Sequence, residues 1–389
     1  MTPARVFVCA DHGLAIVYFL QTDVARVLRD AGADIVLLTD DALVDRLRDR
    51  FADLPLVVRG MRLETIRAYE RKAYDVQWWL GFLRRVGGSR RINTKAMDSY
   101  VHQVALEASP RQAPFLPLAW GLLFLLRRSA RARRLLLAAQ QRFHPPLYGD
   151  LFEEFRPRLV VGSTPGWRQD RYLLREAAVR RVPTASVIVG WDNPSSYSLP
   201  GASVDQITCW SAIQKEELVL GSDWDPDRVH IGGMPIYDGY FRGTWRMPRP
   251  EYFRLHGLDP GRKLLSYACS FVSFSPNYQN VAALAELVSS DSLAFPSQLL
   301  VRLHPNHFWD NWLFADERRR ILRLAQEMPH VHVVEPVPIG GELGYYSGED
   351  MPEKTSMMAH ADVFLTVYST MVVEAAIHDR PIVSVCLDA

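Results

Sequence analysis

The sequence predicts an α/β protein with two domains in tandem, each built on a parallel sheet with helices on both faces. The chain has 389 residues, more than one hydrophobic core normally serves. Short apolar runs, typical of strands buried on both faces, alternate with segments of helical periodicity. Residues 241–262 are rich in Pro, Gly and Arg and show no sustained period. We therefore expect a linker there, between domains at 1–240 and 263–389.

The first predicted domain alternates strands and helices. Its first strand is RVFVCA at 5–10, and a helix at 14–31 ends at Gly32 before the strand ADIVLLTD at 33–40. Its remaining strands are expected at 158–166, 184–193, 206–211 and 228–233, with helices at 168–181 and 212–221.

Residues 59–157 interrupt this alternation and predict a helical insert. Phe115 to Leu126 form an apolar run of twelve residues, and five arginines follow within RRSARARR. The run is too short to span a membrane. Two interpretations stay open. The segment is either a helix lying on an anionic membrane surface, or a helical hairpin packed on the domain with its arginines in solvent.

The second predicted domain continues the alternation to the end of the chain. Strands are expected at 263–271, 297–305, 331–336, 362–369 and 381–387, and helices at 279–290, 310–328, 354–361 and 370–379. A doubly wound domain normally covers its last strand with a further helix. Either the sequence is a fragment that lacks the last C-terminal helices, or the fold closes in an unusual way, and we favour the fragment.

Composition limits the location and the partners. A formal net charge of +1 gives no argument for a nucleic-acid partner. The four cysteines lie far apart without metal-site spacing, so we expect reduced core cysteines and a cytoplasmic protein, peripheral on the inner face of the membrane if the insert binds lipid. We identify no signal peptide and no spanning helix. SDWDPD at 222–227 is a weak metal candidate, and we expect neither a metal nor a cofactor.

Candidate catalytic residues follow the first strand. Asp11, His12 and Gly13 in CADHGLA lie at its carboxyl end, where open α/β sheets bind ligands. His12 could take a proton from an acceptor hydroxyl, with Asp11 orienting it, or it could be a loop histidine without a catalytic task. Asp192 and Asn193 follow a later strand. Together with Gly13 they form the candidate acceptor pocket, although Asn-Pro is also ordinary turn chemistry.

The second domain offers candidates for binding a phosphorylated ligand. Arg302 and His304 in VRLHPN share one face of a strand and could contact phosphate oxygens, or His304 could be a structural hydrogen-bonding group. Ser369 and Thr370 join a strand to a helix whose free N–H groups attract anions, so their hydroxyls could cap the helix or bind phosphate. Glu374, one turn later, could accept hydrogen bonds from a ribose diol.

The stretch ADVFLTVYSTMVVEAAIHDRPIVSV, together with VRLHPN, resembles the carboxyl-terminal half of GT-B glycosyltransferases. These enzymes have two Rossmann-like domains that face each other across a cleft. The resemblance is to bacterial surface-polysaccharide branches and to the CDP-glycerol glycerophosphotransferase-like group. It implies donor phosphate contacts for Ser369 and Thr370 and a ribose contact for Glu374. It covers about residues 158–388, and the segment from GWDNPSSYSLPG to GGMPIYD resembles the interdomain region. The 59–157 insert has no equivalent there.

The resemblance implies an enzyme that moves a sugar, without a metal, from a nucleotide-activated donor to a hydroxyl of a glycan or lipid-linked acceptor. Two alternatives stay open. One is a sugar-nucleotide 2-epimerase, because non-hydrolysing UDP-GlcNAc 2-epimerases share the fold. The other is a non-catalytic nucleotide-binding module of surface-polymer assembly.

Overall fold

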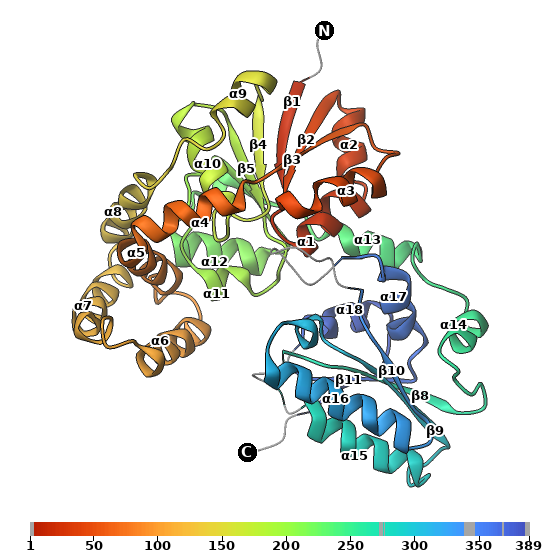
Figure 1. Ribbon diagram of the computed structural model, residues 1–389. Helices are drawn as coiled ribbons and strands as arrows, with labels where there is room; N and C mark the ends of the chain where they lie inside the picture. Colours follow the sequence, from red (N-terminus) through yellow and green to blue (C-terminus); the bar gives the residue numbers. More distant parts are fainter. Residues whose placement is uncertain (1–3, 272–274, 276, 338–346, 368, 386–389) are drawn as a thin grey trace. The chain divides into compact units, whose positions relative to one another are not determined.

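The computed structural model describes residues 4–271, 275, 277–337, 347–367 and 369–385. The chain divides into two compact units, Met1–Met234 and Pro235–Ala389, so the division comes slightly before the predicted domain end at residue 240. Each unit contains one parallel sheet and helices (Figure 1). The predicted class, α/β with two doubly wound domains, is confirmed.

The N-terminal unit has a seven-stranded sheet in the order β3-β2-β1-β4-β5-β6-β7, counted over the described residues. All of its strand pairs are parallel. The strands are β1 (Ala4–Cys9), β2 (Ala33–Thr39), β3 (Leu56–Gly60), β4 (Leu159–Gly162), β5 (Thr184–Val187), β6 (Gln206–Cys209) and β7 (Val229–Ile231). The sequence analysis did not predict β3.

Helices of the N-terminal unit connect these strands and build the insert. They are α1 (Gly13–Ile16), α2 (Val24–Asp30), α3 (Val44–Arg50), α4 (Leu63–Lys72), α5 (Tyr74–Val86), α6 (Lys95–Glu107), α7 (Leu116–Leu126), α8 (Ala130–Gln141), α9 (Gly149–Phe155), α10 (Asp170–Val179), α11 (Asn193–Tyr197) and α12 (Ala212–Ser222). The helix predicted at 14–31 is not continuous. A π-helical turn, Val17–Gln21, follows α1, and Thr22 then has extended backbone angles while its hydroxyl donates to the Tyr18 carbonyl.

Helices α5 to α8 of the insert share a hydrophobic core of their own (Figure 1). Phe82 and Leu83 of α5 pack with residues of α6, α7 and α8, among them Leu123 and Leu136. Leu199, from the loop after α11, joins the same cluster, so the insert is anchored to the sheet-bearing part of its unit.

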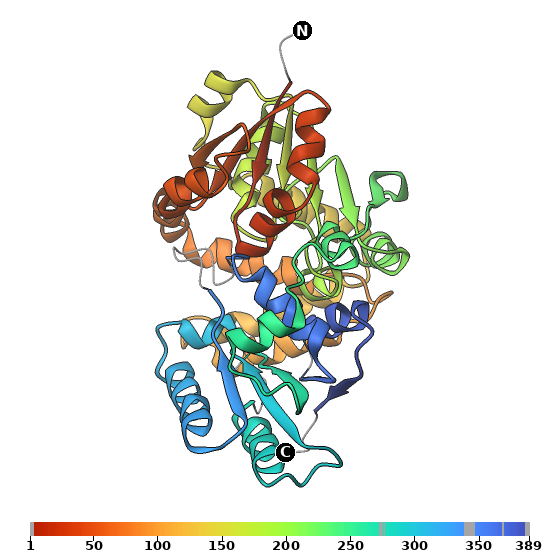
Figure 2. The ribbon, with the colours of Figure 1, turned by 90° about the vertical axis from the view of Figure 1, so that its right-hand side faces the viewer.

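The C-terminal unit has a five-stranded parallel sheet in the order β10-β9-β8-β11-β12, again over the described residues. Its strands are β8 (Lys263–Ala268), β9 (Ser297–Arg302), β10 (Val331–Val334), β11 (Val363–Thr366) and β12 (Ile382–Ser384). Its helices are α13 (Pro235–Arg242), α14 (Arg249–Leu255), α15 (Asn277–Ser289), α16 (Trp312–Glu327), α17 (Met351–His360) and α18 (Met371–Ile377). Helices α15 and α16 cover one face of the sheet, and α17 and α18 the other (Figures 1 and 2).

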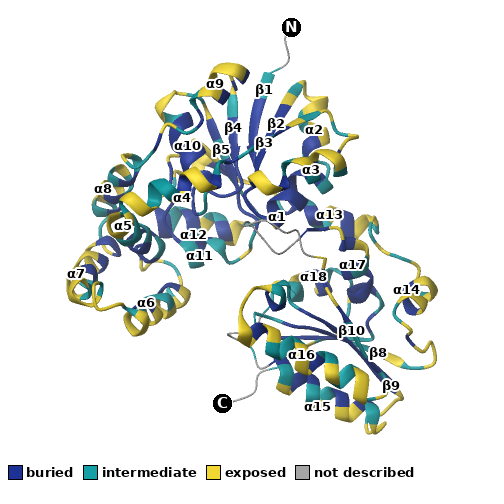
Figure 3. Ribbon diagram, in the orientation of Figure 1, coloured by how far each residue is buried: buried dark blue, intermediate teal, exposed yellow. Residues whose placement is uncertain are grey.

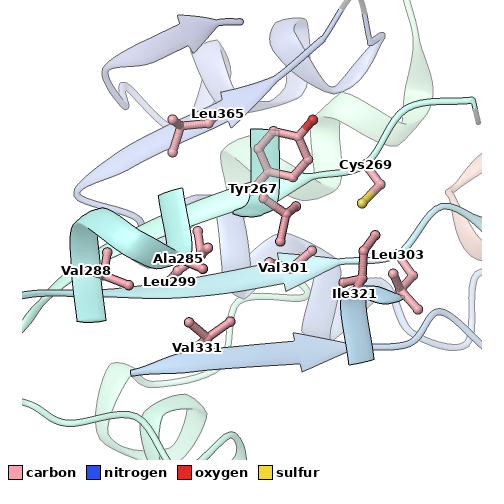
Figure 4. Close-up of a cluster of buried hydrophobic side chains, with 11 residues drawn as sticks. Tyr267, Cys269, Ala285, Val288, Leu299, Val301, Leu303, Ile321, Val331 and Leu365 are labelled. Atoms are coloured by element: carbon pink, nitrogen blue, oxygen red, sulfur yellow. The ribbon is translucent and has the colours of Figure 1, made fainter. Parts of the chain in front are cut away.

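The core of the C-terminal unit lies between its sheet and helices α15 and α16 (Figure 4). Tyr267, Leu299 and Val301 come from the central strands, and Ala285 and Ile321 come from the two helices; all five are fully buried. The continuously apolar runs that predicted strands buried on both faces are therefore explained by helices on each side.

Residues 241–262, predicted as a linker, include helix α14. Its Tyr252 and Phe253 are buried, and the Tyr252 hydroxyl donates to Glu353 of α17 at 2.9 Å. The segment is therefore not irregular throughout, and α14 lies within the C-terminal unit.

Both sheets reverse their strand order at a central strand. In the N-terminal unit the chain moves outward from β1 through β2 and β3, then crosses to β4 on the other side of β1. In the C-terminal unit β8 has the same place, between β9 and β11. The loops leave neighbouring strands in opposite directions at the carboxyl ends of β1 and β4, and of β8 and β11, which is where open α/β sheets generally bind ligands.

Candidate functional site

A buried polar network joins the loops after β1 and β4. Asp11, directly after β1, accepts a hydrogen bond from the Ser163 hydroxyl and one from the backbone N–H of Asp170 at 3.2 Å. The Asp170 carboxylate accepts from the backbone N–H and the hydroxyl of Thr164, both at 2.8 Å. Asp11, Ser163, Thr164 and Asp170 are each at most 3% exposed. The network therefore fixes both loops at the switch point of the N-terminal sheet.

His12 is a neutral hydrogen-bonding group at this switch point. Its Nδ1 accepts the backbone N–H of Ala15 at 3.1 Å and so caps α1. Burial, together with the positive charge of Arg168, lowers the pKa of His12 to about 4. Because the lone pair of Nδ1 accepts this hydrogen bond, the single proton of the neutral ring is on Nε2. This geometry favours His12 as a donor through Nε2 rather than as the general base that the sequence predicted.

Asp11 does not orient His12 by a hydrogen bond in this structure. The nearest oxygen of Asp11 lies 3.8 Å from Nε2 of His12, which is beyond hydrogen-bond length. The carboxylate is instead engaged by Ser163 and Asp170. Asp11 is therefore best described as a positioning residue for the two loops.

Asp170, the first residue of α10, has a strongly perturbed acidity. Burial and the negative charge of Asp11 raise the pKa of Asp170 to about 7, although hydrogen bonds from Thr164 oppose the shift. Two buried carboxylates at one switch point thus share a site in which one of them is readily protonated. The sequence analysis missed Asp170. The sequence feature that could have identified it is an aspartate at the start of the helix that follows GSTPGWRQ.

The predicted acceptor residues lie at the same edge of the sheet but do not form one cluster. Gly13 follows β1, whereas Asp192 and Asn193 follow β5, and β4 lies between these strands. Asn193 accepts the backbone N–H of Gly190 at 2.9 Å, and Asp192 accepts from the Ser196 hydroxyl at 3.2 Å. These bonds are those of a turn that begins α11, so the shared acceptor pocket stays a prediction.

The C-terminal switch point holds Ser369, Thr370 and Glu374 after β11. Ser369 accepts the backbone N–H of Met371, the first residue of α18, at 3.3 Å, while Thr370 is exposed. Glu374 is 8% exposed. Its carboxylate pairs with the Lys354 ammonium at 2.6 Å and accepts from the Tyr240 hydroxyl. The sequence analysis identified none of these contacts of Glu374, because both partners come from distant elements.

Arg302 is held by two carboxylates within its own unit. It is 4% exposed, and its guanidinium pairs with Asp350 and with Glu353. Such an arrangement neutralises the charge that the sequence analysis assigned to a phosphate. Arg302 is thus the predicted phosphate contact that the geometry supports least.

His304 begins the short 3-10 helix Pro305–Phe308. Its Nδ1 accepts the backbone N–H of Asn306 at 3.2 Å, which leaves the proton of the neutral ring on Nε2. Burial, with smaller effects from His307 and Arg302, lowers the pKa of His304 to about 4. The ring is therefore neutral at pH 7 and could contact a phosphate as a hydrogen-bond donor but not as a cation.

The acidic segment 222–227 has structural roles. Asp223 forms a two-pronged ion pair with Arg133, at 2.6 and 2.7 Å, and Asp225 accepts the backbone N–H of Asp227 at 3.0 Å. Over the described residues, no group of three or more His, Cys, Asp or Glu side chains could hold a metal ion.

Comparisons with known proteins give structural likeness only. No protein-family model matches the sequence, and no curated protein matches it. A UDP-GlcNAc 2-epimerase from Neisseria meningitidis bound to UDP-GlcNAc superposes with a TM-score of 0.54 at 11% identity, over 98% of this chain and 82% of that one. A glycosyltransferase from Rickettsia africae ESF-5 superposes with a TM-score of 0.51 at 8% identity, over 99% of this chain and 79% of that one.

The chain has a GT-B fold. The predicted resemblance is confirmed at the level of the fold, and with it a chain made of two Rossmann-like domains. Identities of 8–11% do not decide between the activities found on this fold. The fold's neighbours are enzymes that include both epimerases and glycosyltransferases.

We predict that Asp170 makes the stability of the protein fall between about pH 4 and pH 7. A carboxyl group whose pKa is about 7 in the folded chain and about 3.9 in the unfolded chain binds more protons when folded, so rising pH favours unfolding over this interval. The free energy of unfolding, measured by urea titration at several pH values, should decline less steeply in Asp170→Asn than in the wild type. Parallel pH profiles would contradict this assignment.

Proposed function

We propose that the protein transfers a sugar, or a similar group, from a nucleotide-activated donor to a hydroxyl acceptor in cell-surface glycan or glycolipid synthesis. One observation carries the proposal. In a chain with the GT-B fold, Ser369, Thr370 and Glu374 follow β11 at the switch point of the C-terminal sheet. Two hydroxyls and a carboxylate in this order suit the phosphates and the ribose of a nucleotide, in the place where such sheets bind ligands.

The donor contacts would come from the C-terminal unit. Thr370 is exposed and Ser369 half-buried, so their hydroxyls are accessible to a diphosphate. Glu374 would accept hydrogen bonds from the ribose, while Lys354, 2.6 Å from its carboxylate, would hold that carboxylate in place. His304 would add a neutral donor to the phosphate. Arg302, with Asp350 and Glu353, would support the strand rather than the ligand.

Departure of a nucleoside diphosphate develops negative charge on the leaving oxygens. Donors that are already oriented stabilise such charge without reorganisation. In the proposed reaction the hydroxyls of Ser369 and Thr370 and the ring of His304 would do this in place of a divalent cation.

The acceptor contacts would come from the N-terminal unit. His12 lies at the switch point of β1 and β4, and its Nε2–H could donate to the acceptor or to the transferred sugar. Gly13, Asp192 and Asn193 lie at the same edge of the sheet, as candidate acceptor contacts. With Asp11 and Asp170 buried behind the loops, the carboxylates would position the site rather than touch the substrate.

A 2-epimerase acting on a sugar nucleotide is the second candidate. It is favoured by the fold likeness to the Neisseria enzyme and to a UDP-GlcNAc 2-epimerase from Listeria monocytogenes, described as putative, with a TM-score of 0.52 at 10% identity over 98% of this chain and 78% of that one. The same donor contacts would serve either reaction, but an epimerase needs no acceptor.

Peripheral membrane contact is part of the proposal, and α7 supports it. Phe115, Leu118, Leu122 and Leu125 are 40–64% exposed and follow a spacing of three and four residues, so they share one face. Figure 3 shows exposed stretches along α7. Exposed arginines at 128, 131 and 134 come next along the chain. An apolar face flanked by cations suits an anionic membrane surface. No helix in the described part of the chain is long and apolar enough to span a bilayer.

We expect one nucleoside diphosphate among UDP, CDP, GDP and ADP to raise the melting temperature, because a ligand of the folded state stabilises it by about 2.7 kcal/mol at 100 times its Kd. The matching nucleotide sugar should then release its nucleotide only when a glycan or lipid-linked acceptor is present. Conversion of the sugar without acceptor would instead identify an epimerase. Binding without any turnover would favour a non-catalytic module, and no stabilisation by any nucleotide would contradict the donor site.

Glu374→Gln should weaken binding of that nucleoside diphosphate roughly 10- to 100-fold, since a hydrogen bond to a charged group contributes about 1.5–3 kcal/mol. Titration calorimetry measures the affinity. Because Lys354 loses its charged partner in this variant, thermal melting is measured as well, to separate a loss of stability from a loss of affinity. Asp362→Asn is the matched control. It removes a carboxylate that accepts the backbone N–H of Leu264 at 2.8 Å, next to the opposite end of β11. Equal affinities in both variants would reject the ribose contact.

The protein should co-sediment with vesicles containing phosphatidylglycerol, and less so as salt rises, because salt screens the attraction of the arginines to lipid. Replacing Leu118 and Leu122 together by glutamate should reduce the pelleted fraction to that seen with neutral vesicles. Leu255→Glu, at an exposed leucine of α14, is the control and should pellet like the wild type. Pelleting that is insensitive to the α7 substitutions would show that α7 is not the contact.

A further inference from the structure

A pocket of about 310 Å³ in the N-terminal unit lies between the insert and α10. Helix α5 supplies most of its wall, and α4, α6, α8 and α10 supply the rest. None of the residues assigned above to the donor or the acceptor lines it. Its volume lies near the lower end of the range of small-molecule sites, which is about 300–1,000 Å³.

The charge of this pocket is unbalanced. Arg84, Arg85, Arg171 and Arg175 line it, and Glu70, which pairs with Arg171, is the only carboxylate among its lining residues, all of which are described. We call it the arginine pocket. Burial and the other three arginines lower the pKa of Arg84 to about 9, and burial and Arg171 lower the pKa of Arg175 to about 10. Burial is the larger cause of both shifts, and the neighbouring positive charges add to it.

The buried arginines of the pocket are held in place by neutral groups. Arg84, 7% exposed, donates to the carbonyl of Leu199 at 3.2 Å. Arg175, 3% exposed, donates to the carbonyl of Gly201 at 2.6 and 2.8 Å. Backbone carbonyls fix these guanidinium groups without cancelling their charge. The cations are therefore oriented before any ligand arrives, which reduces the cost of binding an anion.

Donors without acceptors also line the arginine pocket. Nε of Arg85, Nε2 of Gln77 and Nε2 of Gln140 are buried and have no hydrogen-bond partner within the described part of the chain. Gln140 is only 4% exposed. A guanidinium Nε–H is a donor in every orientation, so a ligand that satisfies it must bring an acceptor. Buried donors are rarely left unpaired in folded proteins.

Aromatic rings also line the arginine pocket. Trp78 and Phe82 of α5 stack at a ring separation of 5.8 Å, and the Arg85 guanidinium lies 3.7 Å from the centre of the Tyr100 ring. All four residues line the pocket. Aromatic walls beside oriented donors suit a compact ligand with an apolar ring face and a charged substituent.

We propose that the arginine pocket binds a monosaccharide-sized ligand that carries a phosphate or carboxylate group. The charged group would accept hydrogen bonds from Arg85 and Gln140, and the ring would lie against the aromatic wall. Because the site lies wholly within the N-terminal unit, its occupation does not depend on the proposed transfer reaction. Asp170 and Arg171 are consecutive in α10, so a ligand in the pocket lies next to the helix that carries the buried carboxylate.

The test uses titration calorimetry of the full chain at low salt with glucose 1-phosphate, glucuronate and glucose as probes. Glucose 1-phosphate or glucuronate should bind and glucose should not. Arg85→Met and Gln140→Leu should each weaken binding of the charged probe at least tenfold. Gln140→Leu should not lower the melting temperature, because it removes a donor that has no partner. Arg131→Met, at an exposed arginine on α8, should bind like the wild type.

Three results would overturn the proposal. These are the absence of binding by both charged sugars, equal binding of glucose, and unchanged affinity in Arg85→Met and Gln140→Leu. The protein could also bind phosphatidylglycerol vesicles, lose that binding in Arg85→Met and bind neither free sugar. This result would assign the pocket to a lipid headgroup and would also reject a sugar ligand. The thermal shift caused by a nucleoside diphosphate should be the same in both pocket variants, so failure here leaves the donor site untouched.

Discussion

Parallel pairing on both sides of a central strand is the constraint on which each unit depends. Parallel strands need long crossovers, so helices must cover both faces and the polar loops collect at the carboxyl ends. In the N-terminal unit this places the loops after β1 and β4 side by side, and in the C-terminal unit the loops after β8 and β11. The candidate residues His12 in one unit, and Ser369 with Glu374 in the other, lie at these two points.

Several polar residues that invite a catalytic interpretation are used for structure. Asp11 ties two loops through Ser163 and the backbone of Asp170, and Arg302 is enclosed by Asp350 and Glu353. A charge taken out of water must find a partner in the protein. Buried charges near a switch point are therefore often occupied already, and partly exposed hydroxyls or neutral histidines are better placed to meet a ligand.

Some arginines of the insert are buried and others are exposed. Arg127 pairs with Asp98 at 2.5 Å and Arg133 pairs with Asp223, so these two hold the insert together and to α12. Arg128, Arg131 and Arg134 are exposed. The helices of this run are packed as a hairpin, and contact of their exposed face with a membrane stays a proposal. The arginine pocket lies between the insert and α10, and its four arginines come from α5 and α10.

The sequence by itself determined the fold class, because continuously apolar strands and alternating helices are local patterns that each segment carries on its own. It also located the positions after β1, β9 and β11, because strand ends can be read from where an apolar run stops. Strand β3 was missed because it runs into the segment interpreted as the insert from residue 59, and helix α14 because it lies in a stretch rich in Pro, Gly and Arg.

Only the tertiary structure decided which of these residues are already bound. Glu374 pairs with Lys354 and accepts a hydrogen bond from Tyr240, and the backbone of Asp170 donates to Asp11. The contacts with Tyr240 and with Asp11 each join residues more than a hundred positions apart in the sequence. The four arginines of the pocket come from α5 and α10, which are distant in the chain. Burial, charge balance and hydrogen-bond partners arise when distant segments pack together, so no local pattern contains them.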